Sequence, residues 1–324
     1  MKIILFTLTL FIITSVPAQS TFQKKYGTAS TQETILAFCA TFDSGFAATG
    51  TYTDPVNLGS NGKVLFYKFN KRGEVVLHRY FASVGSSGQT GRSISQTKDS
   101  GYVILSINSE RTNSASTSSI IKLDKNLKVE WVRTFGGNGG TFASSLILTA
   151  DGGFAFTGFT GFVNEASPNS GVIVGKVSGS GSLEWIKKIG PTASNGFGIV
   201  QDNDGGFTIT GGFQTSGPSG SPNLTILKLN AEGIVIKAKR SSALGIGYSI
   251  LKTADNGYIV GGTLEPGNAG YVMLKFNSDL DVQWSKVVQK NEGYSTCYVV
   301  PFSEGTYLLV GRDIFNFNSA LQFF

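Results

Sequence analysis

A short turn sequence recurs along the chain at nearly even spacing, and this repeat constrains the fold more than any other feature. The copies read TFDSGFAATG from Thr41, TKDSGYVILS from Thr97, TADGGFAFTG from Thr149, DNDGGFTITG from Asp202 and TADNGYIVGG from Thr253, with a weaker EGTYLLVG from Glu304. Catalytic chemistry is rarely needed six times at even spacing. The motif therefore indicates architecture rather than an active site.

Each repeat divides into four short apolar runs. In the third copy they are SSLILTA (144–150), FAFTG (154–158), GVIVGKV (171–177) and LEWIKKIG (183–190). Four strands per repeat of roughly 50 residues are typical of a β-propeller, in which each repeat is one blade. The Asp-Gly turn between the first two runs favours positive φ angles, and its aspartate can accept hydrogen bonds from the turn's own amides. We expect the aromatic residue that follows the turn to pack between blades.

The tryptophans fall on one structural position. Trp131, Trp185 and Trp284 each follow the last apolar residue of a third run by the same number of residues, and we expect them to pack between blades. When the same spacing is counted from Phe317 in the last repeat, the tryptophan position falls beyond the last residue of the sequence. We therefore expect the last blade to lack its fourth run.

The missing run matches a segment at the other end of the chain. FQKKYG (22–27) is similar to WVRTFG (131–136) and WIKKIG (185–190). We therefore expect an all-β fold, a six-bladed β-propeller of four-stranded blades, in which residues 22–27 complete the last blade beside a third strand around Phe315–Asn318. Such closure leaves no dangling blade.

The N-terminal residues read as a secretory signal. Lys2 precedes an apolar run from Ile3 to Ile13, and small residues before Ala18 suit cleavage. The run is shorter than the roughly 20 apolar residues of a spanning helix. We expect residues 1–18 to be removed and 19–324 to form one propeller domain. That domain would be secreted, periplasmic or at the cell surface, without a membrane span.

Composition and charge limit the classes of partner that we expect the protein to bind. Of the residues, 40% are hydrophobic and 15% charged, which favours β structure rich in turns. The net charge is +6 but the basic residues are scattered, so we expect no nucleic-acid partner. We also expect a monomer. His78 is the one histidine of the chain, and Cys39 and Cys297 are its two cysteines. With so few metal ligands and bases, we expect no metal site, no cofactor and no catalytic triad. Whether the cysteines are paired is left open.

The repeats resemble a known group, secreted and mostly bacterial propeller-repeat proteins with units close to DGGYIVAG…LKLDSNGNVLWSKTFGG. The matching stretches are DGGFAFTG, IIKLDKNLKVEWVRTFGG and YVMLKFNSDLDVQWSKVV. The resemblance covers the chain from Phe22 to Phe324 and implies a propeller, and it carries little about function because such proteins are largely uncharacterised.

Function should reside on the face that carries the long loops between second and third strands. We expect a glycan or protein ligand there. The candidate contacts are Glu110, Arg111, Phe162, Glu165, Glu265, Arg312 and Asp313. Two other functions stay open: a carboxylate-dependent glycoside hydrolase or lyase, and a structural envelope or matrix component without a discrete ligand. Asn223-Leu224-Thr225 is a glycosylation acceptor if the host glycosylates.

Overall fold

The described part of the chain is built from antiparallel strands alone. The computed structural model describes residues 32–53, 62–81, 86–110, 116–136, 140–161, 171–191, 193–214, 221–265, 270–289, 296–303, 305–312 and 319–323. These residues form strands and turns without a helix, so none of them belongs to a helix long and apolar enough to cross a membrane. The expected all-β class is confirmed for this part of the chain.

Three repeats form separate four-stranded sheets in simple up-and-down order. Unit 1 contains β1 (Gln32–Ala40), β2 (Phe46–Thr53), β3 (Lys63–Phe69) and β4 (Val75–Phe81). Unit 2 contains β5 (Ser86–Gln96), β6 (Tyr102–Glu110), β7 (Ser116–Leu123) and β8 (Val129–Phe135). Unit 3 contains β9 (Thr141–Leu148), β10 (Phe154–Thr160), β11 (Gly171–Val177) and β12 (Leu183–Ile189).

The next two repeats share one long strand. They contain β13 (Asn195–Gln201), β14 (Phe207–Phe213), β15 (Asn223–Leu229), β16 (Val235–Lys252), β17 (Tyr258–Glu265), β18 (Gly270–Phe276) and β19 (Val282–Gln289). The first half of β16 pairs with β15 and the second half with β17, so β16 is the last strand of unit 4 and the first of unit 5. The sharing explains why these units form one seven-stranded sheet.

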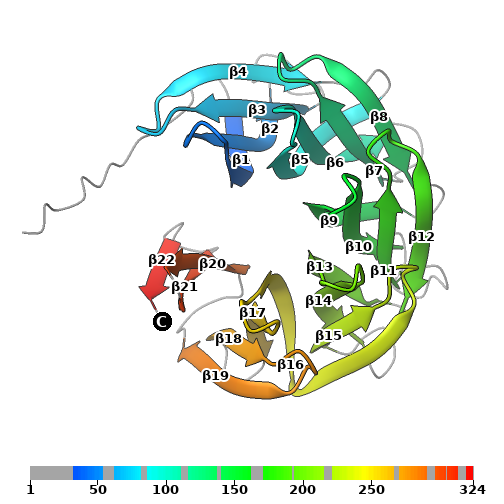
Figure 1. Cartoon of the computed structure of the whole chain (residues 1–324), viewed down its shortest axis with the longest axis vertical. Coiled ribbons are helices and arrows are strands. Elements are labelled where there is room, and N and C mark those ends of the chain that lie inside the picture. Colours follow the sequence, from blue (N-terminus) through cyan, green and yellow to red (C-terminus); the bar gives the residue numbers. More distant parts are fainter. Residues whose placement is uncertain are drawn as a thin grey trace, which may run out of the picture.

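A three-stranded sheet follows unit 5. It contains β20 (Cys297–Ser303), β21 (Thr306–Arg312) and β22 (Ser319–Phe323). Figure 1 shows the sheets standing side by side around a common centre, with β1, β5, β9 and β13 nearest to it and β4, β8 and β12 outside. This arrangement is propeller-like. The sheets of β1–β4 and β20–β22 stand at the two ends of the arc, which the described strands do not close.

The Asp-Gly turn is a small hydrogen-bonded unit. Asp151 accepts hydrogen bonds from the hydroxyl of Thr149 at 2.5 Å and from the amide of Gly153 at 3.1 Å, as the sequence predicts for the turn amide. The residue after the aspartate, Gly152, has a φ of 84°. A partner that the repeat motif did not reveal completes the unit: Lys176 on β11 donates to Asp151 at 2.5 Å.

The same lysine position recurs in the sheets. Asp43, Asp99 and Asp255 pair with Lys68, Lys122 and Lys275 at 2.6 to 2.7 Å. The lysine side chains are nearly buried, whereas the carboxylates stay half-exposed. Unit 4 departs from the pattern, because Asp202 replaces the threonine and accepts hydrogen bonds from Thr208 and Tyr258. In four units, an ion pair therefore fastens the Asp-Gly turn to the third strand of the same sheet.

These ion pairs predict an acid-sensitive stability. Hydrogen bonds from lysine and threonine lower the pKa of Asp43, Asp151 and Asp255 to about 2, below the usual value near 4. A carboxyl whose folded-state pKa is lowered stabilises the fold above pH 4, and this contribution disappears as the pH falls towards 2. We therefore expect the melting temperature to fall between about pH 4 and pH 2.

Asp151→Asn should flatten that pH profile and cost about 1 kcal/mol at pH 7, a value reduced for the half-exposed carboxylate. Thermal unfolding followed by circular dichroism at several pH values measures both effects. Glu232→Gln, an exposed carboxylate in another turn, is the matched control. If the two variants had the same pH profile, the Asp–Lys pairs would not be the cause.

The core lies between neighbouring sheets. Phe154 and Phe156 of unit 3 are buried against Val103 and Leu105 of unit 2, and similar clusters join the following units. Trp131 packs edge-on against Phe154, with ring centroids 5.7 Å apart. The prediction that aromatic residues after the turn pack between blades is confirmed at four positions, Tyr102, Phe154, Phe207 and Tyr258. Phe46, at the open end of the arc, stays 38% exposed.

The predicted position of the last blade's third strand is wrong. The strand that pairs with β21 is β22. Leu308 lies opposite Phe323 just as Ala155 lies opposite Lys176 in unit 3, so β22 takes the place of the third strand. Both FNFN and SALQFF offer alternating apolar residues near the C-terminus, and periodicity cannot choose between them because register is set by pairing. Residues 22–27 and 313–318 lie outside the described residues, so closure by 22–27 stays a prediction.

The outer strands carry a basic residue at one repeated position. The residues are Arg79, Arg133, Lys187, Lys239 and Lys286, which pair in the same register with the third strand of each unit. All five are exposed. Exposed apolar residues such as Val132 and Ile236 also lie on these outer strands. Charged residues on an edge strand oppose pairing with a second molecule, so the basic position protects the outer edge of each of these five units.

Candidate functional site

Two faces of the molecule differ in their connections. Because the strands alternate in direction, the Asp-Gly turns and the turns between third and fourth strands share one face, as predicted. The connections between second and third strands emerge on the other face. Glu110, Glu265 and Arg312 are the last residues of β6, β17 and β21, so their backbones lie at this long-loop face in three different units. Arg111, Phe162, Glu165 and Asp313 lie outside the described residues.

A feature that the sequence reasoning missed lies on the innermost strand of each unit. The pairing of first and second strands slips by one residue, always opposite the same point of the second strand. The extra residues are Leu36, Arg92, Ser144, Phe197 and Tyr248. We call these five residues the bulge ring. β-Bulges re-aim a side chain and occur often beside functional sites.

A repeated glycine makes the bulge sterically feasible. The fifth residue of the second strand is Gly50, Gly158, Gly211 or Gly262 in four units. A Cβ at Gly211 would overlap the carbonyl oxygen of Asn195 on β13, and one at Gly158 would overlap that of Phe142. The glycine that ends FAATG, FAFTG and FTITG is thus required by close approach of the bulged strand. This glycine was the available signal in the sequence.

The bulge ring is accessible although its strands are packed. Arg92 is exposed, and Leu36, Ser144, Phe197 and Tyr248 are partly exposed. Neighbours on the same strands, such as Ile94 and Ile199, are buried between sheets. The five positions are equivalent in backbone geometry and different in chemistry: two aromatic rings, a guanidinium, a hydroxyl and an aliphatic side chain. Such variation on a fixed framework is typical of ligand contacts.

Two members of the ring belong to a row of aromatic contacts that crosses three units. Phe142 on β9 stacks on Phe159 of β10 at 5.3 Å between centroids. Phe159 lies 6.1 Å from Phe197 on β13, which in turn lies 5.1 Å from Tyr248 on β16. All four rings are partly exposed. They form a continuous apolar surface on the inner side of units 3 to 5, which we call the aromatic row.

Polar groups lie beside the equivalent region of unit 2. Asn108 accepts a hydrogen bond from the side-chain amide of Gln89 at 2.8 Å and donates to Ser119 at 2.7 Å. Both amides are buried, and Gln89 also donates its backbone amide to the carbonyl of Gly62 in unit 1. A satisfied buried network of this kind rigidifies its surroundings. It holds the inner strand that carries Arg92 in place.

The other sequence-based candidates are not brought together. Cys39 and Cys297 are free thiols; Cys39 packs at the contact of units 1 and 2, and Cys297 at the contact of unit 5 with the last sheet. Asn223 is 7% exposed and donates its amide to the carbonyls of Ser241 and Ala243, so the folded chain does not present it for glycosylation. The described residues contain no group of three metal-ligating side chains.

No protein-family model matches the chain, and no curated protein does either. Several solved structures are similar to the chain. A protein of unknown function from Dyadobacter fermentans DSM 18053 is 10% identical, with a TM-score of 0.62 over 88% of this chain and 92% of that one. A protein of unknown function from Bacteroides caccae is 11% identical, with a TM-score of 0.50 over 78% and 81%.

A third similar structure is the subtype N10 neuraminidase-like protein of A/little yellow-shouldered bat/Guatemala/060/2010. It is 12% identical, with a TM-score of 0.52 over 88% of this chain and 92% of that one. At such identities the likeness concerns the fold and leaves activity open. The repeated four-stranded sheets and these neighbours together give the chain a propeller-like, all-β fold.

Proposed function

We propose that the protein is a glycan-binding scaffold whose ligand contacts the bulge ring and the aromatic row. One observation carries this proposal: five geometrically equivalent bulge positions on the innermost strands are accessible and chemically different. A residue that serves only to pack the fold has no reason to be both accessible and variable at one position of five units.

The chemistry of the surface favours a sugar. A sugar ring has an apolar face of C–H groups and an edge of hydroxyls, and partly exposed aromatic rings pack well on such a face. Phe197 and Tyr248 are adjacent at 5.1 Å and offer two such rings. Binding sites for small molecules combine aromatic walls with a few polar groups. Arg92 and Ser144 supply polar groups at the equivalent positions of units 2 and 3.

The rigidity of the opposite face supports the same function. Ion pairs between aspartate and lysine fasten the turn face in four units, so the inner strands are held by a stiff framework. Binding is strongest where the contact groups are ordered before the ligand arrives. We include the long-loop residues Glu110, Arg111, Phe162, Glu165, Glu265, Arg312 and Asp313 as further contacts at the rim of the same site.

The proposal is tested with a glycan array, followed by calorimetric titration of the best oligosaccharide. We expect Phe197→Ala and Tyr248→Ala each to weaken binding at least tenfold, about 1.4 kcal/mol, with little change in melting temperature. Phe42→Ala is the matched control, since Phe42 is 67% exposed in a turn of the opposite face.

Other outcomes separate the remaining functions. Binding that Phe42→Ala reduces as much as Phe197→Ala would contradict the proposed site. Turnover of an oligosaccharide would favour the hydrolase or lyase. If no glycan on the array bound the protein, a protein ligand or a structural role would be favoured.

We further propose that the ring has six blades and that residues 22–27 supply the missing strand beside β22. Among the described residues, five units have four strands, and the last sheet has three. In the matching of FQKKYG to WIKKIG, Lys24 takes the place of Lys187, the basic residue of the outer strands. Residues 1–18 would act as an export signal, placing the propeller outside the cytoplasm, as in the secreted repeat proteins that the chain resembles.

A further inference from the structure

A second surface of the molecule, away from the bulge ring, has the features of a small-molecule site. A pocket of about 320 Å³ lies between the outer parts of units 3 and 4. Its walls come from the end of β12, the turn that follows it, and β14, β15 and β16. This volume lies at the lower end of the usual range for ligand sites.

The lining of the pocket is almost entirely apolar. Phe213 and Leu227, 3% and 5% exposed, form its inner wall. Gly190 has a φ of 80°, and a Cβ there would lie 3.0 Å from the ring of Phe213, so the glycine permits this close approach. Thr225 is buried, and its hydroxyl already donates to the carbonyl of Asn223 at 3.0 Å. The walls therefore suit an apolar group.

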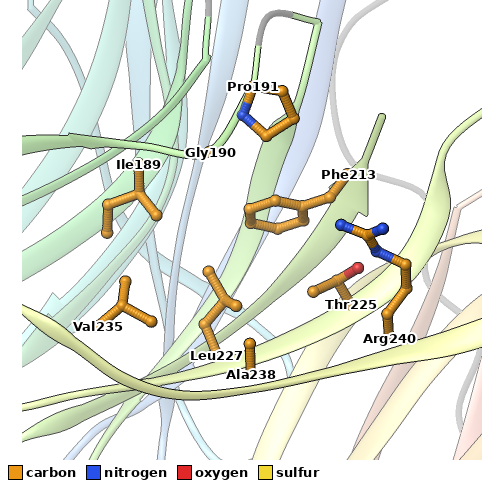
Figure 2. A pocket seen from close by; sticks show the side chains of 9 residues that line it. All are labelled: Ile189, Gly190, Pro191, Phe213, Thr225, Leu227, Val235, Ala238 and Arg240. Atoms are coloured by element: carbon orange, nitrogen blue, oxygen red, sulfur yellow. The ribbon is translucent and has the colours of Figure 1, made fainter. Parts of the chain in front are cut away.

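One charged group lies at one end of this apolar surface. Figure 2 shows the guanidinium of Arg240 beside Phe213 and Thr225, whereas Ile189 and Val235 line the other end. Arg240 is exposed, and no carboxylate of the described residues forms an ion pair with it. Its neighbours on the strand behave differently, because Lys237 and Lys239 pair with Asp279 and Asp281 of unit 5. Arg240 thus keeps its hydrogen-bond donors available at the pocket.

One residue in the lining of the pocket, Ala238, has a small side chain. Ala238 lies opposite Leu227, and the same register position is larger in units 1 to 3, where it is His78, Val132 or Ile186, and small again in unit 5, where it is Ser285. Figure 2 shows Ala238 beside Leu227, on the side away from Val235, so a larger residue at 238 would project into the pocket next to Leu227.

We propose that this pocket binds a small carboxylate with an apolar body, such as an arylalkanoic acid. The apolar body would lie against Ile189, Phe213 and Leu227, and the carboxylate would accept hydrogen bonds from Arg240. A guanidinium binds a carboxylate through two parallel hydrogen bonds, which makes the pair stronger than a neutral contact. The site is independent of the glycan site proposed above, since its lining includes no residue of the bulge ring or the aromatic row.

The test compares two probes that differ only in charge, 4-phenylbutyrate and 4-phenyl-1-butanol, titrated into the purified protein by ligand-observed NMR. We expect saturable binding of both, with the carboxylate about tenfold tighter. Arg240→Gln should weaken the carboxylate about tenfold and leave the alcohol unchanged. Ala238→Ile should abolish binding of both, and Ala238→Val, a smaller change, should weaken both.

Lys239→Gln is the matched control, because it removes a positive charge from the adjacent residue of the same strand. It should leave both affinities unchanged. Melting temperatures of the variants establish that each is folded. The proposal is overturned if neither probe saturates, if Arg240→Gln leaves the carboxylate affinity unchanged, or if Lys239→Gln weakens the carboxylate as much as Arg240→Gln does.

Discussion

A variant that lacks residues 22–27 is expected to lose about 4 kcal/mol or more of its free energy of unfolding, equivalent to a fall in melting temperature of roughly 10 °C. If this segment is the fourth strand of the last sheet, its removal exposes apolar surface and leaves the hydrogen-bonding edge of β22 unpaired. Urea unfolding measures the loss. Lys24→Pro should have a similar effect because proline removes a ladder hydrogen bond, whereas Ser20→Pro, outside the segment, should be nearly neutral.

The register of this closure can be tested directly. Unit 3 pairs Val174 with Lys187, and the same register would place Leu321 opposite Lys24. In a background with Cys39 and Cys297 replaced by serine, cysteines at 24 and 321 should form a disulfide on oxidation. Cysteines at 24 and 320 should not, because a shift of one residue moves a side chain to the other face of the sheet. Equal cross-linking of the two pairs, or of neither, would contradict closure by this segment.

Gly211→Ala is expected to cost about 3 kcal/mol of stability and to weaken glycan binding as well. The added methyl group would overlap the carbonyl of Asn195, a backbone atom that cannot rotate away, so β13 must shift. The bulge at Phe197 lies directly opposite, between Gly196 and Gly198, and a shifted strand would displace its ring. Chemical unfolding and oligosaccharide titration of the same preparation measure both effects.

Unit 2 offers the control for this prediction. Ser106 occupies the equivalent position on β6, so a side chain is already accommodated there. Ser106→Ala removes a hydroxyl whose one proton is shared between Asn108 Oδ1 at 3.3 Å and the carbonyl of Ser119 at 3.4 Å, and should cost about 1 kcal/mol. If Gly211→Ala proved as mild as Ser106→Ala, the repeated glycine would have no role in the bulge.

Much of the fold could be predicted from the sequence because it depends on local chemistry. The Asp-Gly turns, the positive φ angles after the aspartate and the alternating apolar runs are decided within a few residues of each other. Repetition then multiplies a weak local signal, and the tryptophan spacing marks equivalent positions in β8, β12 and β19. The turn aspartates could be recognised as structural for the same reason.

The candidate site was harder to predict, since it depends on how separate strands meet. The loop residues chosen from sequence, such as Glu110 and Arg312, follow from strand direction alone, whereas Arg92 and Tyr248 become equivalent only through a one-residue slip in pairing. In the sequence, nothing distinguishes Lys176 from other strand residues. The ion pair with Asp151 forms only because β11 brings the two side chains together. The glycine at the fifth position of four second strands is visible in the sequence, but the reason for it is a carbonyl oxygen on the neighbouring first strand.

The sequence by itself determined the repeat, its turns and its all-β character, because these arise from the preferences of neighbouring residues. Only the tertiary structure decided the bulge ring, the aromatic row, the sharing of β16 by two units and the pocket beside Arg240. Each of these results from contact between segments far apart in the chain. Strand register and side-chain volume across such contacts are properties of the packed molecule, and the order of residues along one strand does not contain them.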